Sequence, residues 1–188
     1  MTLDLDENLH LAMHASSTGQ HHACLSYLSE VLKEQPDHPK ALHLLASQHA
    51  ELGLTERAIA ELTRAVGIDP AMEIARFQLS LLLLDKKRHE EAVTHLLLLS
   101  SNASESLRLF SQGVLSLAKA DIPQAQNRIA AGLAAPAENP ALSKLMQRLL
   151  DAISPKTGGA GIATPDGTSS GEPLFLGAYR EASGSTSR

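Results

Sequence analysis

One pattern occurs twice in the first 70 residues of the chain, with 34 positions between equivalent residues. In each copy a glycine is followed by a small residue, a leucine and a proline at the same intervals. The first copy consists of Gly19, Cys24, Leu28 and Pro36, and the second consists of Gly53, Ala58, Leu62 and Pro70. A period of this length is typical of helical hairpins, which must stack on their neighbours to bury a continuous core. The sequence therefore predicts a stack of helical hairpins, and the usual task of such a stack is to hold another polypeptide.

The composition agrees with a helical globular protein. Hydrophobic residues make up 43% of the 188 residues and aromatic residues 3%, so the apolar content is mostly the good helix formers Leu and Ala. The formal net charge is −5, and 86–88 is a lone basic triplet, which argues against binding to nucleic acid. The single Cys24 excludes an intramolecular disulfide, and we interpret it as a buried small hydrophobic residue.

Targeting signals are not evident in the sequence. Residues 1–7 lack the basic and apolar regions of a secretory signal, and no run of 18 apolar residues occurs that could cross a membrane. We therefore expect a cytoplasmic protein without membrane insertion.

The second copy has the pattern of an amphipathic helix, a turn and a second helix. Four residues share one helical face at the spacing i, i+3, i+4 and i+7: Leu42, Leu45, Ala46 and His49. Gly53 then permits the positive φ that ends a helix, and Thr55 is suited to cap the helix that follows. This stretch resembles the tetratricopeptide repeat, whose pattern is W-x2-L-G-x2-Y…A-x3-F…P, with departures in the aromatic slots at Leu42, His49 and Leu62.

The resemblance divides the chain into units. Residues 5–153 form the predicted repeat domain, with hairpins at 5–38, 39–72, 73–105 and 106–139 and an amphipathic capping helix at 140–153. Residues 154–188 are rich in Gly and Ser and are predicted to be a disordered tail. The expected fold is all-α, a right-handed α-solenoid of about four tetratricopeptide-like hairpins followed by the capping helix and the tail.

The tail contains one apolar segment, at residues 172–180. Its apolar side chains are Leu174, Phe175, Leu176 and Tyr179. Apolar residues within a polar linker often mark a segment that folds on binding, so this segment is a candidate interaction motif. The alternatives are an accidental cluster and a pairing with the protein's own surface.

No catalytic motif is found in a suitable context, and we predict that the protein is not an enzyme and has no cofactor. His10 and His14 stand at i and i+4, but no carboxylate or cysteine completes a ligand set at a convincing spacing. The nine histidines are better explained by polar helix faces, so no metal site is predicted.

The resemblance implies that the first helix of each hairpin lines a concave groove. The predicted groove residues are Leu9, Met13, His43, Ser47, Ile74, Phe77, Leu81, Leu84, Leu107, Phe110, Val114 and Leu117, and the same positions also contain Asp6, Ser16, Lys40 and Ala50. The first half of this face is mixed, whereas the second half is apolar and contains two Phe. Such a face suits an amphipathic helix or an extended segment with apolar anchors. Alternatively, neighbouring helices or a dimer partner cover these side chains.

These patterns predict a non-catalytic protein–protein interaction module, a scaffold, adaptor or chaperone-like protein that holds a partner segment in its groove. Two alternatives remain open. In the first, the protein is a chaperone of the kind found in bacterial secretion systems, which it resembles in size and architecture. In the second, the groove is autoinhibited or dimerised through the protein's own tail.

Overall fold

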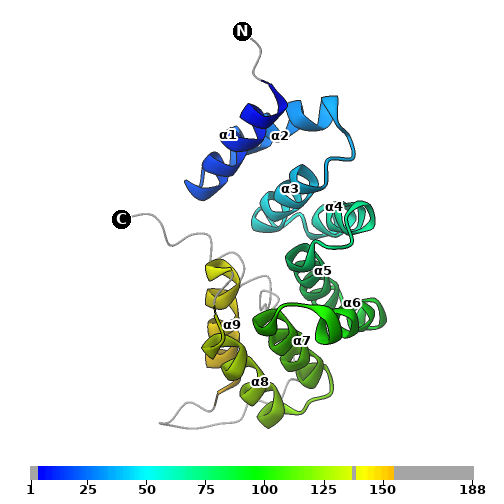
Figure 1. Cartoon of the computed structure of the whole chain (residues 1–188), viewed down its shortest axis with the longest axis vertical. Coiled ribbons are helices and arrows are strands. Elements are labelled where there is room, and N and C mark those ends of the chain that lie inside the picture. Colours follow the sequence, from blue (N-terminus) through cyan, green and yellow to red (C-terminus); the bar gives the residue numbers. More distant parts are fainter. Residues whose placement is uncertain (1–3, 137–138, 155–188) are drawn as a thin grey trace.

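The computed structural model describes residues 4–136 and 139–154, and within these ranges the chain forms nine α-helices and no strand (Figure 1). The helices are α1 (Leu5–Ser17), α2 (His21–Glu34), α3 (Pro39–Glu51), α4 (Thr55–Ile68), α5 (Glu73–Asp85), α6 (His89–Asn102), α7 (Glu105–Ala118), α8 (Ile122–Ala134) and α9 (Pro140–Ile153). The prediction of an all-α solenoid is confirmed. The predicted tail and its apolar segment lie outside the described residues.

Consecutive helices pair as hairpins, α1 with α2, α3 with α4, α5 with α6 and α7 with α8, and the second helix of each hairpin packs on the first helix of the next. Figure 1 shows the stack as an arc, with α3, α5 and α7 along its inner side and α4 and α6 along its outer side. The last helix, α9, packs on α8 and lies on the inner side of the arc. No helix in the described part of the chain is long and apolar enough to span a membrane.

The turn within each hairpin needs one residue with a positive φ. Gly19 (φ 70°) and Gly53 (φ 78°) supply it in the first two hairpins, where a glycine adopts this conformation at little steric cost. Lys87 (φ 60°) and Ala120 (φ 59°) stand at the equivalent places in the third and fourth hairpins. The backbone geometry of the repeat therefore persists where its glycine has been lost.

In the described part of the chain, the core consists of three clusters along the stack. The first joins α1, α2 and α3, the second joins α3 to α6, and the third extends from α5 to α9. Cys24 is fully buried in the first cluster, where burial and the nearby charge of Glu51 raise the pKa of its thiol to about 11. A thiol in this setting acts as a small apolar core residue.

Candidate partner-binding pocket

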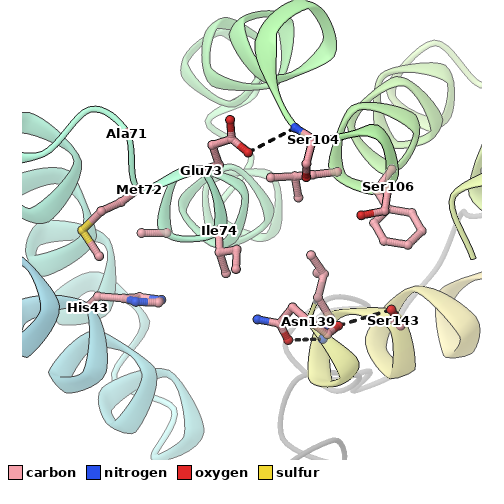
Figure 2. Close-up of a pocket in the computed structure, with 13 residues that line it drawn as sticks. His43, Ala71, Met72, Glu73, Ile74, Ser104, Ser106, Asn139 and Ser143 are labelled. Atoms are coloured by element: carbon pink, nitrogen blue, oxygen red, sulfur yellow. Dashed lines mark hydrogen bonds between the residues drawn. The ribbon is translucent and has the colours of Figure 1, made fainter. Parts of the chain in front are cut away.

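A pocket of about 310 Å³ lies on the inner side of the arc, where α3, the start of α5, the start of α7 and the start of α9 approach one another (Figure 2). Its apolar walls are Ala71, Met72, Ile74, Ala75, Leu107, Phe110 and Leu142. Its polar lining residues are His43, Glu73, Ser104, Ser106, Asn139 and Ser143. A concave apolar site with a few polar groups is the usual form of a binding site.

Close packing of α7 on α8 fixes the apolar wall that Phe110 provides. The Phe110 ring is 1% exposed, and a Cβ atom added at Gly132 of α8 would lie 2.6 Å from its Cδ1 and Cε1 atoms. A Cβ at Gly113 of α7 would likewise lie 2.6 Å from Cγ1 of Ile129. Two glycines thus allow the hairpin to close tightly, and the absence of a side chain at Gly132 leaves room for the aromatic ring.

Backbone caps hold the polar side of the pocket in place. Asn139 precedes α9, and its Oδ1 accepts a hydrogen bond of 3.0 Å from the Leu142 amide. The Ser143 hydroxyl donates to the Asn139 carbonyl at 3.2 Å. Oε2 of Glu73, in the first turn of α5, accepts a hydrogen bond of 3.2 Å from the Ser104 amide, which connects the start of α5 to the start of α7. The positions of three helix starts are therefore set by side chains that also line the pocket.

His43 enters the pocket from α3, and Figure 2 shows its ring pointing into the space between the lining residues. Its Nε2 lies 2.6 Å from Oε1 of Gln78 on α5. Burial lowers the pKa of His43 below its usual 6.5, despite the opposing effect of this hydrogen bond, so the ring is neutral at pH 7. Because Oε1 accepts only, Nε2 holds the single proton, and Nδ1 is left as a hydrogen-bond acceptor.

Ser106 contributes a hydroxyl to the pocket lining. The residue is 8% exposed and lies in the first turn of α7. The described residues provide no hydrogen-bond partner for its Oγ, and Figure 2 shows this oxygen directed toward the pocket. Ser104, the N-cap of α7, also makes no side-chain capping bond. The Oγ of Ser106 is not among the fully buried, unpaired polar atoms of the described residues, so it is open to solvent and can bond with water or with a ligand in the pocket.

The charge of the pocket limits what it accepts. Among its lining residues, Glu73 is acidic and none is Lys or Arg. A terminal carboxylate is usually held by basic side chains, and no Lys or Arg of the described residues lines the pocket. The arrangement suits a neutral, mainly apolar segment whose backbone groups bond with Ser106 and His43.

The structure brings together four of the twelve groove residues predicted from the sequence, namely His43, Ile74, Leu107 and Phe110. The other eight lie elsewhere. Phe77, Leu81 and Val114 are buried in the third core cluster, Leu84 and Leu117 are half-buried against it, and Ser47 is half-buried on α3. Leu9 packs against the first cluster, and Met13 is 55% exposed on α1.

This placement differs from the exposed apolar face expected across the third and fourth hairpins. The physical reason is the packing around α5 and α7, which are surrounded by helices on both sides. Leu142, Leu145, Met146 and Leu149 of α9 belong to the same cluster as Phe77 and Phe110. Apolar side chains of a helix that is covered by neighbouring helices are buried in the core. Of the predicted apolar face, the part that still borders a cavity is therefore the pocket described above. The sequence analysis did not predict that α9 covers part of this face. The apolar stripe of α9 was the feature of the sequence that could have indicated it.

The described residues contain no group of three or more His, Cys, Asp or Glu side chains that could hold a metal ion. The predicted tail motif of Leu174, Phe175, Leu176 and Tyr179 lies outside the described part of the chain.

Comparisons with known proteins agree with this architecture. Residues 39–72 match the family model of the tetratricopeptide repeat. None of the curated proteins compared matches the chain. Among solved structures, the chain is similar to PilF of Pseudomonas aeruginosa, reported in a functional characterization of that protein. The identity is 21%, the match covers 78% of this chain and 67% of that one, and the TM-score is 0.59, so this similarity shows the fold.

Proposed function

Because residues 39–72 are a tetratricopeptide repeat and the described helices have the fold of such proteins, we propose that the chain is a non-catalytic interaction module. It holds a segment of another protein in the pocket between α3, α5, α7 and α9. The observation that carries this proposal is the pocket itself, which joins an apolar wall to the Ser106 hydroxyl, a group open to water or to a ligand.

The chemistry of the pocket supports an extended peptide as the ligand. One Leu or Phe side chain, placed between Ile74, Leu107 and Leu142, would contribute about 1.5–3 kcal/mol through burial. The Ser106 hydroxyl is suited to donate to a peptide carbonyl, and Nδ1 of His43 is suited to accept from a peptide amide. Each such bond contributes about 0.5–1.5 kcal/mol, so recognition would rest mainly on the apolar anchor.

The test is a selection of short peptides from a random library on the immobilised full chain, followed by affinity measurement on variants. Ile74→Asp is the informative variant, because Ile74 is half-buried in the pocket wall and its replacement does not remove a core residue. Met13→Asp is the matched control on α1, outside the pocket. Selected peptides should carry a bulky apolar residue, and Ile74→Asp should weaken their binding at least about tenfold, whereas Met13→Asp should not.

Circular dichroism and thermal melts establish that both variants remain folded. Equal affinity of the selected peptides for Ile74→Asp and the unmodified chain would refute the proposed pocket.

A further inference from the structure

We propose that the segment Leu174–Tyr179 of the same chain occupies this pocket when no partner is bound, so that a partner must displace it. This inference rests on the proposed function, since it assigns a competing occupant to the same site. Three observations carry it: the chemistry of the segment, the position at which α9 ends, and the charge of the pocket.

The segment has the chemistry that the pocket requires. Residues 155–188 contain seven of the twelve glycines of the chain, yet Leu174, Phe175 and Leu176 stand together within them. Phe175 is one of three phenylalanines, and the other two are 0% and 1% exposed in the core. A bulky apolar side chain from this run matches the wall formed by Ile74, Leu107, Phe110 and Leu142.

The charges are compatible with docking. No charged residue lies between Leu174 and Tyr179, so nothing in the segment repels Glu73, the acidic residue of the pocket. The flanking charged residues are Glu172, Arg180 and Glu181, so both signs occur beside the segment and Arg180 is the one that the Glu73 carboxylate attracts.

The connecting length matches the distance that must be covered. The pocket lies at the start of α9, at Asn139, Leu142 and Ser143, whereas the chain leaves this helix at its other end, after Ile153. The helix has 14 residues, so the chain must return about 21 Å. A Gly/Ser-rich chain of the length of residues 155–173 has a root-mean-square end-to-end distance of about 24 Å. Effective concentration is greatest when these two lengths agree, and it then reaches the millimolar range.

This effective concentration means that weak affinity is sufficient. If the effective concentration is about 1 mM and the segment alone binds with a dissociation constant of about 0.1 mM, docked molecules outnumber open ones about tenfold. An external peptide that uses the same pocket then binds about tenfold more weakly than it would to an open pocket. Only partners that bind the pocket tightly enough to displace the segment are then bound, which favours partners whose apolar side chains fill the pocket well.

The direct test is 19F NMR of the full chain labelled with fluorophenylalanine. The chain has three phenylalanines and therefore gives three resonances, and Phe175→Leu identifies the one from the segment. We expect the Phe175 resonance to be displaced from the free-peptide position, to move to that position in Ile74→Asp, and to stay displaced in the control Met13→Asp. A Phe175 resonance at the free-peptide position in the unmodified chain would overturn the inference.

A dilution series separates docking within one chain from docking between two copies. Docking within one chain leaves the Phe175 resonance independent of protein concentration. A shift toward the free position on dilution would assign the contact to a second copy and would overturn the proposal.

The functional consequence is measured with a peptide selected from the library. Its affinity should rise about tenfold in full-chain Phe175→Ser, and it should stay unchanged in Ile162→Ser, which replaces an apolar residue of the tail outside the segment. If peptides bind through Ile74 but Phe175 is free and Phe175→Ser has no effect, the autoinhibitory role fails while the proposed function stands. If Phe175 is docked but no selected peptide depends on Ile74, the proposed function fails while the intramolecular contact stands.

Discussion

Replacing Gly132 of α8 by Ala tests the packing that forms the aromatic wall of the pocket. The added Cβ would lie 2.6 Å from two atoms of the Phe110 ring and 3.2 Å from the Ser106 carbonyl oxygen. Normal contacts between carbon atoms are about 3.5–4.0 Å, so the ring would have to move by about 1 Å. Phe110 is 1% exposed and belongs to the third core cluster, which leaves it little room to do so.

Two opposing effects set the size of the change. Overpacking a core in this way costs about 1–3 kcal/mol, whereas replacing a helical glycine by alanine gains about 1 kcal/mol. We therefore expect Gly132→Ala to lower the free energy of unfolding by about 1 kcal/mol. Gly67→Ala is the matched control, because Gly67 lies in α4 with no atom within 4 Å of its added Cβ. This control should raise the free energy of unfolding by about 0.5–1 kcal/mol.

Urea denaturation followed by circular dichroism measures both values, and a double-mutant cycle with Phe110→Leu assigns the cost to the ring. The Gly132→Ala penalty should become smaller in the Phe110→Leu background, because the shorter side chain lacks the ring atoms in question. The reasoning is refuted if Gly132→Ala stabilises the chain as much as Gly67→Ala does.

Three further predictions follow from other parts of the structure. Burial lowers the pKa of His43 from 6.5, so on acidification the unfolded chain binds this proton at a higher pH than the folded chain does. The free energy of unfolding should therefore fall as the pH drops below 6.5. If the free energy of unfolding depends on pH with the same slope in His43→Gln, His43 is not a cause of the fall. The fully buried Cys24 thiol, with its pKa raised to about 11 by burial and Glu51, should be alkylated at pH 8 on the order of 100-fold more slowly in the native chain than in urea; equal rates would show that it is accessible. Lys87→Gly and Ala120→Gly should each raise the free energy of unfolding by about 0.5–1 kcal/mol, since both residues adopt positive φ; a lower value for both would contradict the turn geometry.

The fold could be predicted because the sequence repeats the same pattern at a fixed interval of 34 residues. Gly19 and Gly53 mark the same turn 34 residues apart, and each is preceded by an amphipathic helix. The period is weaker in the third and fourth hairpins, where Lys87 and Ala120 occupy the turn position. In these two hairpins the packing of neighbouring helices holds the turn in its positive-φ conformation without a glycine. The stack tolerates the loss of the glycine because most of its stability comes from packing between helices.

The pocket was only partly predictable because exposure depends on contacts that a repeat pattern does not contain. Phe77 and Phe110 were both expected on the inner surface from their places in the repeat, but both are buried. Their burial depends on the third core cluster, to which α9 contributes although it follows all four hairpins in the sequence. Asn139 and Ser143 line the pocket because α9 lies on the inner side of the stack. The repeat pattern assigns residues to positions within a single hairpin, so it does not predict this contact.

The position of α9 gives the pocket a property that a simple stack lacks. In a solenoid each unit contacts its neighbours, so stability is a sum of local terms and the ends unfold independently. Here His43 from the second hairpin and Asn139 from the start of α9 line the same pocket. A ligand between them would contact units that are not adjacent in the stack, and it would stabilise the state in which all of them are folded. Occupation of the pocket, by a partner or by the chain's own segment, would therefore join the second hairpin to the C-terminal helix in one cooperative unit. Binding and the stability of the C-terminal half would thus be thermodynamically linked.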